Sequence, residues 1–201
     1  MKTSDFDYDL PPEYIAQTPI EPRDRARLMV LDRASNKLRH AYFYQLGEFL
    51  QPGDVLVLNE TRVIPARLFG RKIPSGGRVE LLLLKKIDDD VWEVLVGGKG
   101  LHTGRQIRFD DGRLAEIISE LDGPRRLVRF NEPIEAHLHK LGQTPLPPYI
   151  HAPLANSERY QTVYSRQPGS VAAPTAGLHF TPQLIEQLKA QGVNFARVTL
   201  H

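Results

Sequence analysis

The sequence predicts a mixed α/β domain into which a small antiparallel β-barrel is inserted. Residues 66–130 contain short β-like runs at roughly even spacing, separated by turn sequences such as Gly-Gly, Asp-Asp-Asp and Asp-Asp-Gly. This pattern is typical of a small barrel or sandwich. The flanking residues mix helical and strand patterns instead. We therefore expect a discontinuous α/β domain over residues 1–64 and 150–201, with the barrel over residues 65–149.

The strongest expected elements of the α/β domain lie on either side of the barrel. Asp54–Asn59 has four consecutive apolar residues, which predict a buried strand. Thr181 suits a helix N-cap and Pro182 suits the first helical position, so a helix is expected through residue 191. The other expected elements are strands over 28–32, 38–42 and 194–200, and helices over 44–50, 132–142 and 157–164.

Composition excludes several classes of protein and site. The 201 residues include no cysteine, which excludes disulfides and thiolate metal sites, and no apolar run long enough to cross a membrane. With no signal peptide apparent, we expect a cytoplasmic protein without a membrane partner.

The net charge is only +2, but residues 62–140 hold fifteen Lys and Arg against twelve Asp and Glu, so this part is mildly basic. The chain stops one residue after an expected strand, and we expect it to be incomplete at the C-terminus.

The stretch Gly169–Thr181 has the character of a ligand-binding loop. Its small residues allow close approach of a backbone to a ligand, and it ends in Gly-Leu-His directly before a helix. A helix N-terminus offers unpaired N–H groups to an anionic or polar ligand. We therefore expect a binding loop with His179 as a candidate chemical group, although a lone histidine is also commonly structural.

A second polar group, Asn59–Arg62, follows the strand Asp54–Asn59. Ligands of open α/β sheets bind outside the carboxyl ends of strands, so these side chains are binding candidates. Arg67 could add a second cation toward a phosphate or ribose. The alternative is a solvated turn in which Arg62 pairs locally. We expect Asn59–Arg62 and the loop Gly169–Thr181 to face each other across one cleft.

Histidines and prolines give weaker signals. His137 and His139 would lie on different faces of a helix, and no other histidine has a partner at ligand spacing, so no metal site is expected. Pro145–Ile150 could be a proline-rich peptide ligand. Its place between helices favours a structural connector that positions Tyr149.

Five segments, in order along nearly the whole chain, resemble the S-adenosylmethionine:tRNA ribosyltransferase-isomerase family of queuosine biosynthesis, the QueA family. They are Leu56–Gly70, Pro145–Ile150, Tyr160–Tyr164, Gly169–Thr181 and Val198–His201. The resemblance implies an α/β domain with an inserted β-barrel. Members of this family are considerably longer, so the chain resembles their N-terminal part.

The resemblance also implies a reaction. The ribosyl group of S-adenosylmethionine is transferred to 7-aminomethyl-7-deazaguanine in a tRNA anticodon and isomerised to give epoxyqueuosine, while adenine and methionine leave. S-adenosylmethionine is a cosubstrate in this reaction, and no prosthetic group or metal is implied. Candidate bases are His179, Glu60 and His201, and candidate donors to developing negative charge are Thr175 and Arg62. The remaining substrate-binding candidates are Asn59, Arg67, Tyr149, Pro174 and Gly177.

A tRNA partner requires cations that contact phosphates. The candidates are Arg125, Arg126, Lys85 and Lys86, and the alternative is a solvated barrel surface. A rival hypothesis is a non-catalytic RNA-binding module, in which the barrel is a stacking platform. The barrel region has few aromatic residues, which weakens this rival. A third possibility is an inactive fragment of the enzyme.

Overall fold

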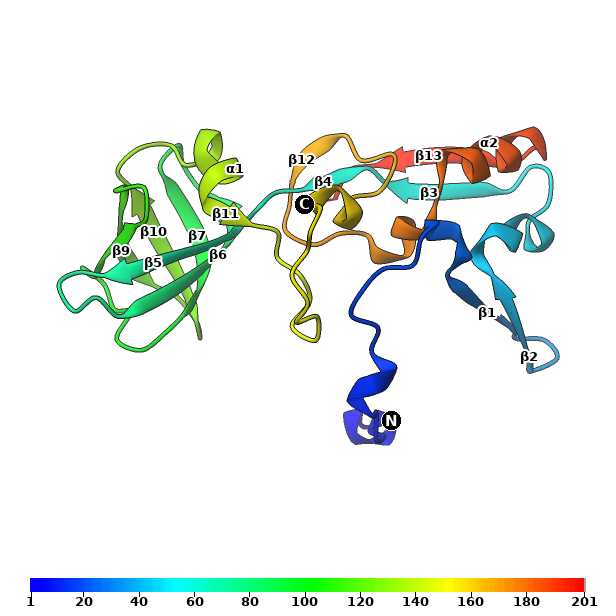
Figure 1. Ribbon diagram of the computed structural model, residues 1–201, viewed down its shortest axis with the longest axis horizontal. Coiled ribbons are helices and arrows are strands. Elements are labelled where there is room, and N and C mark those ends of the chain that lie inside the picture. The colour runs from blue at the N-terminus through cyan, green and yellow to red at the C-terminus, as the bar shows by residue number, and fades with distance from the viewer. Residues whose placement is uncertain (201) are drawn as a thin grey trace.

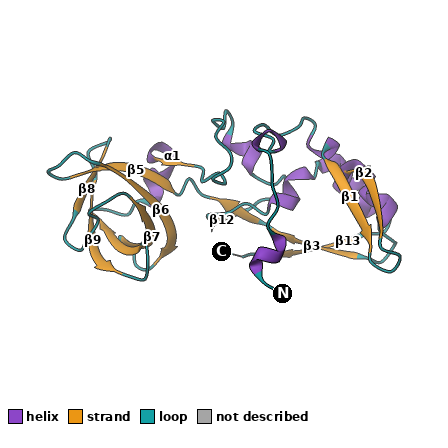
Figure 2. Cartoon of the chain, turned by 90° about the horizontal axis from the view of Figure 1, so that it is seen from below, coloured by secondary structure: helices purple, strands orange, loops and turns teal. Residues whose placement is uncertain are grey.

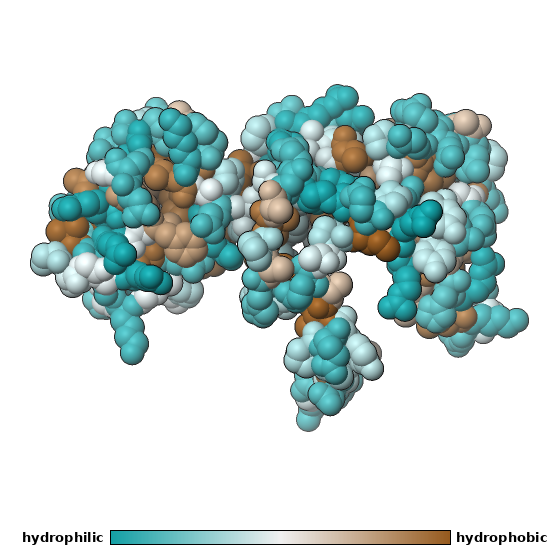
Figure 3. All heavy atoms as spheres, viewed as in Figure 1, coloured by the Kyte–Doolittle hydropathy of each residue, from teal (hydrophilic) through white to brown (hydrophobic). Residues whose placement is uncertain are grey.

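The computed structural model describes residues 1–200. It shows two lobes side by side, a barrel and an α/β lobe, joined by two chain segments (Figure 1). The N-terminal residues, which include a 3-10 helix over Thr3–Phe6 with no buried side chain, extend away from both lobes (Figures 1 and 3). No helix among the described residues has the length and apolar character needed to cross a membrane.

The barrel is a closed ring of six antiparallel strands, as Figure 2 shows end-on. The ring order is β5 (Arg67–Lys72), β6 (Arg78–Lys86), β7 (Val91–Gly97), β10 (Arg125–Phe130), β9 (Leu114–Glu120) and β8 (Gln106–Phe109), which pairs back to β5. Alternate residues point inward and form a core that is almost fully buried. Its largest side chains include Trp92, Phe109 and Phe130, and Leu68, Leu81, Leu83, Ile107 and Ile117 are fully buried. The predicted barrel is confirmed.

Closure of the ring depends on Gly70 in β5. A Cβ atom at this position would lie 2.7 Å from Ile107 Cγ2 and 3.0 Å from the carbonyl oxygen of Arg108. Because β5 and β8 must approach closely to complete the hydrogen-bonded ring, the absence of a side chain here has a direct structural reason.

The chain leaves the barrel beside the point where it enters. A 3-10 turn over Glu135–His137 and the short helix α1 (Leu138–Leu141) lead into β11 (Gly142–Gln143), which pairs with the start of β5. The helix predicted over 132–142 is therefore shorter, because residues 142–143 pair as a strand. A Cβ atom at Gly142 would lie 1.8 Å from the carbonyl oxygen of Pro65, so the two crossing segments touch there.

The α/β lobe contains two parallel strand pairs and a hairpin. β3 (Val55–Asn59) pairs with β13 (Asn194–Val198), and β4 (Thr61–Val63) pairs with β12 (Gln167–Ser170). The hairpin consists of β1 (Arg27–Asp32) and β2 (Lys37–Tyr42), which leads into a 3-10 helix over Phe43–Phe49. Helix α2 (Pro182–Ala190) buries Leu184 and Leu188 in the core of this lobe. The helix predicted over 157–164 is a 3-10 turn over Ser157–Tyr160.

The strand predicted at Asp54–Asn59 is present, but it is not buried as expected. Val55 and Val57 are 57% and 64% exposed. Among the described residues, strand β3 pairs only with β13. The face of β3 that carries Leu58 packs into the core with α2, and the face that carries Val55 and Val57 is left exposed. Parallel strands are usually covered on both faces, and an apolar run alone does not reveal how many faces are covered.

Candidate active site

Parallel pairing between β4 and β12 brings together two segments that lie a hundred residues apart. Thr61 lies opposite Gln167, Arg62 opposite Pro168 and Val63 opposite Ser170. The loop Gly169–Thr181 therefore begins beside the segment Asn59–Arg62. The predicted proximity of these two segments is present in the backbone.

A buried glutamine joins the segment Tyr160–Tyr164 to this pair of strands. Gln161 is 6% exposed, and its Oε1 accepts a hydrogen bond from the Val63 N–H at 3.0 Å. Its Nε2 donates to the Val63 carbonyl at 2.9 Å. The side chain thus acts as an extra strand residue beside β4. This role is not predictable from the sequence, because a polar residue in a turn is ordinary.

Replacing Gln161 with alanine should lower the free energy of unfolding by about 2–4 kcal/mol, because two buried backbone groups of Val63 lose their partners. Chemical denaturation measures this directly. Alanine at the exposed Gln143 is the matched control and should change stability by less than about 0.5 kcal/mol. Equal effects of the two substitutions would contradict the assigned role.

Arg23, which was not predicted from the sequence, joins the segment that contains Gln161 to the loop Gly169–Thr181. Its guanidinium donates to the carbonyls of Gln161 at 2.6 Å, Glu158 at 2.9 Å and Leu178 at 3.4 Å. Three backbone acceptors from two segments converge on one side chain. No local sequence pattern signals such a role.

His179 ends a 3-10 helix over Thr175–His179, directly before α2. Its half-buried ring lies 5.4 Å from the ring of Phe43, measured between centroids. Burial lowers the pKa of His179, and a hydrogen bond with the backbone of Arg23 opposes this effect. The imidazole is therefore neutral at pH 7 and can accept a proton.

The lowered pKa of His179 makes stability depend on pH. The unfolded state binds the proton more readily, so this contribution to stability is complete above about pH 6.5 and is lost as the pH falls from there toward the folded pKa. We expect the free energy of unfolding of the wild type to fall more steeply between pH 7 and 5 than that of His179→Gln. Parallel pH profiles of the two proteins would contradict this assignment.

The remaining candidates of the loop, Thr175, Pro174 and Gly177, have different surroundings. Thr175 is exposed, and Pro174 accepts a hydrogen bond from the Gly177 N–H at 2.8 Å. Gly177 is buried, and a Cβ atom there would lie 2.1 Å from the hydroxyl oxygen of Tyr164. A glycine is thus required for packing against Tyr164, whichever ligand the loop binds.

Most side chains of Asn59–Arg62 already have protein partners. Asn59 Oδ1 accepts from the N–H and hydroxyl of Thr61 at 3.1 and 2.9 Å. Glu60 forms an ion pair with Arg197 of β13 at 3.1 Å. Arg62 donates to Ser165 Oγ at 3.2 Å and pairs with Glu158. Within residues 1–200, no hydrogen bond joins His179 to Glu60, so the structure does not link these two candidate bases directly.

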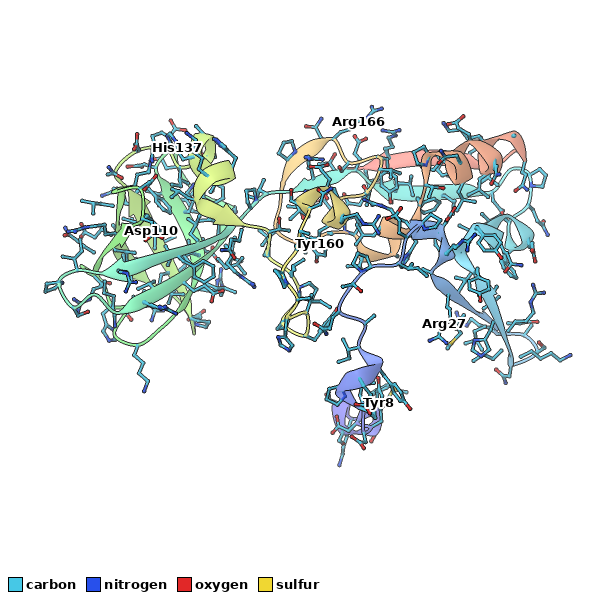
Figure 4. The ribbon with its side chains drawn as sticks, viewed as in Figure 1. Tyr8, Arg27, Asp110, His137, Tyr160 and Arg166 are labelled. Carbon is cyan, nitrogen blue, oxygen red and sulfur yellow. The ribbon has the colours of Figure 1, made fainter. Side chains whose placement is uncertain are left out.

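A hollow of about 220 Å³ lies next to these ion pairs. It is lined by residues of the turn before β12, helix α2 and β13, including Tyr164, Arg166, Lys189 and Arg197. Figure 4 shows Arg166 and Tyr160 on the α/β lobe, well away from Asp110 on the barrel. Within residues 1–200, no group of three or more His, Asp or Glu side chains is placed to hold a metal ion.

The sequence matches the model of a protein family described as "Queuosine biosynthesis protein" over residues 3–201. The chain belongs to this family. Two proteins named S-adenosylmethionine:tRNA ribosyltransferase-isomerase, from Symbiobacterium thermophilum and Acetivibrio thermocellus, are each 54% identical to it over 205 aligned positions, and one of the same name from Clostridioides difficile is 51% identical. Each alignment covers 100% of this chain and 60% of the relative.

A solved structure is also similar to this member of the queuosine biosynthesis family. The S-adenosylmethionine tRNA ribosyltransferase of Thermotoga maritima is 36% identical, with a TM-score of 0.41. The match covers 98% of this chain and 57% of that one.

Two of the predicted substrate-binding residues of this family member lie outside the pairing of β4 with β12. Arg67 begins β5 in the barrel and pairs with Glu80 at 3.1 Å. Tyr149 is exposed in the connector, where its carbonyl accepts from Gln17 Nε2 at 3.0 Å. His201 lies outside the described residues.

The predicted RNA-contacting residues of the barrel mostly face carboxylates. Arg125 pairs with Glu93 at 2.6 Å, and Arg126, whose side chain is 13% exposed, pairs with Glu120 at 3.2 Å. Lys86 pairs with Glu135 at 2.6 Å and with Asp89 at 3.2 Å, and these two contacts raise the pKa of Lys86. Lys85 lies opposite Glu93 in the sheet. An RNA role for these four residues remains a prediction.

Proposed function

We propose that the chain carries the S-adenosylmethionine site of a tRNA ribosyltransferase-isomerase. In this reaction the ribosyl group of S-adenosylmethionine moves to 7-aminomethyl-7-deazaguanine in a tRNA anticodon and is isomerised, and adenine and methionine leave. Membership of the queuosine biosynthesis family over residues 3–201 and the names of its relatives support the proposal. The chain spans 60% of the length of those relatives. We also propose a cytoplasmic location, which a tRNA substrate supports.

The pairing of β4 with β12 carries the proposal. It holds Asn59–Arg62 beside the start of the loop Gly169–Thr181. Gln161 hydrogen-bonds Val63 next to the first segment, and Arg23 donates to the carbonyls of Gln161 and of Leu178 in the loop. Such a framework restricts the motion of a site, and precise placement of reacting groups is a large part of catalysis.

We assign the base to His179. The sulfonium of S-adenosylmethionine acidifies the neighbouring ribose C–H bonds, and the neutral imidazole accepts the proton. Glu60 remains the second candidate base; its carboxylate is engaged by Arg197, which makes it better suited to positioning or to interaction with the sulfonium cation. The exposed hydroxyl of Thr175 and the guanidinium of Arg62 donate hydrogen bonds to the ribose oxygens, on which negative charge develops, and to the leaving adenine. Arg67, Tyr149, Pro174, Gly177 and His201 remain binding candidates.

Release of adenine from S-adenosylmethionine tests the function. We expect the chain to release adenine only when a tRNA carrying the deazaguanine precursor is also present. Binding of tRNA with no binding of S-adenosylmethionine would contradict the proposal and support a non-catalytic RNA-binding module. Binding of both without release would show that the chain holds the substrates but not the complete catalytic machinery.

A further inference from the structure

Three arginines lie directly opposite one another on neighbouring strands of the barrel wall. Arg71 of β5 faces Arg78 of β6 on one side and Arg108 of β8 on the other. All three side chains are exposed. Neighbouring strands are about 4.8 Å apart, and like charges directly opposite in a sheet are destabilising. We call this row the arginine ladder.

Within residues 1–200, none of the three guanidinium groups of the ladder forms an ion pair with a carboxylate. Arg71 donates a hydrogen bond to the carbonyl of Gly76 at 3.3 Å. Glu80, two residues along β6 from Arg78, is taken by Arg67. This contrasts with Arg125, Arg126 and Lys86, which all have acidic partners.

Two adjoining hollows lie at the ladder, of about 490 and 240 Å³. Arg71 lines both, and Lys72, Arg78 and Arg108 add further positive charge against the single carboxylate of Asp110. Phe69, which lines the smaller hollow, is 44% exposed. Figure 1 shows β5 running away from the α/β lobe, and Figure 4 places Asp110 on the barrel. The ladder is therefore separate from the candidate active site.

We propose that the arginine ladder binds consecutive phosphates of the tRNA backbone, with Phe69 available to stack on an unpaired base. Guanidinium groups bind phosphate oxygens in pairs, and a row of them matches a chain of regularly spaced anions. Aromatic side chains beside cations are typical of sites for single-stranded RNA. The inference rests on the proposed function, which supplies RNA as the partner.

The test is tRNA binding by the whole chain at salt concentrations from 50 to 200 mM. The triple variant Arg71→Ala, Arg78→Ala, Arg108→Ala should bind a tRNA transcript about ten- to a hundredfold more weakly at 100 mM salt. The slope of log affinity against log salt concentration is negative, and in this variant its magnitude should be smaller by about 2 to 3. The triple lysine variant should keep most of the slope, because it retains the charge.

A matched control removes three exposed cations that lie beside carboxylates, by the changes Arg39→Ala, Arg129→Ala and Lys37→Ala. Arg39 pairs with Glu48, Arg129 pairs with Asp90, and Lys37 lies opposite Asp32 in the hairpin of β1 and β2. This control loses the same net charge but should keep the wild-type slope to within about 1. Since the ladder is repulsive without RNA, the alanine variant should melt no lower than the wild type, which excludes misfolding as the cause of lost binding.

Three results would overturn the inference, and they separate it from the proposed function. If the wild type binds tRNA and the ladder variant has the same affinity and slope, the ladder alone is excluded and the proposed function stands. If polyglutamate or inorganic phosphate displaces tRNA from the ladder at equal charge concentration, the site binds anions generally rather than RNA. If the wild type binds no tRNA, the ladder and the proposed function both fail.

Discussion

The variant His179→Ala should release adenine from S-adenosylmethionine about 10²–10⁴ times more slowly than the wild type, while its affinity for S-adenosylmethionine changes little. A positioned general base contributes a factor of this size, and His179 is held neutral by burial against Phe43 beside the start of α2. The rate of tRNA-dependent adenine release and the dissociation constant are the two quantities to measure.

The matched control is His139→Ala, which removes an exposed histidine of α1 on the barrel. It should leave the rate unchanged. A His179→Ala variant with wild-type turnover would exclude His179 as the base and transfer attention to Glu60. A loss of binding as large as the loss of rate would instead assign His179 to substrate binding.

The variant Gly142→Ala should lose about 3 kcal/mol or more of unfolding free energy, the largest stability effect that we expect from a single methyl group in this chain. Gly142 has a φ of −91° and a ψ of 153°, which any residue adopts, so backbone strain does not contribute. The added Cβ would lie 1.8 Å from the Pro65 carbonyl oxygen, an atom of the backbone that cannot rotate away. The segments that enter and leave the barrel would have to separate.

Gly47→Ala is the control for this substitution. Its Cβ would also meet an atom closely, at 2.4 Å, but that atom is the end of the flexible Gln191 side chain, which can move. We expect a change below about 1 kcal/mol there. Denaturant unfolding of both variants decides the matter, and equal losses would show that the junction at Gly142 is not tightly packed.

The barrel was predictable from the sequence because each of its strands and turns is marked by residues that are close together in the chain. Alternating apolar residues and turn sequences mark each strand, and closure then requires only that β5 and β8 meet, as Gly70 permits. Helix α2 was equally predictable, since Thr181 caps it by accepting from the Leu184 N–H at 3.2 Å.

Contacts between distant segments were not predictable in detail. Gln161 and Arg23 are ordinary polar residues in the sequence, and their roles depend on which carbonyl and N–H groups the fold leaves beside them. The arginine ladder is also hidden, because its members are separated along the chain and meet only through strand register. The adjacent pair Arg125 and Arg126 is conspicuous in the sequence, yet both residues meet carboxylates.

The most direct test of the central claim, that this chain holds S-adenosylmethionine between Asn59–Arg62 and the loop Gly169–Thr181, is titration with S-adenosylmethionine followed by the amide NMR signals of the chain. We predict that the signals of these two segments, and of Gln161 between them, shift together along one binding curve. Shifts confined to the barrel, or no shifts at millimolar S-adenosylmethionine, would contradict the account.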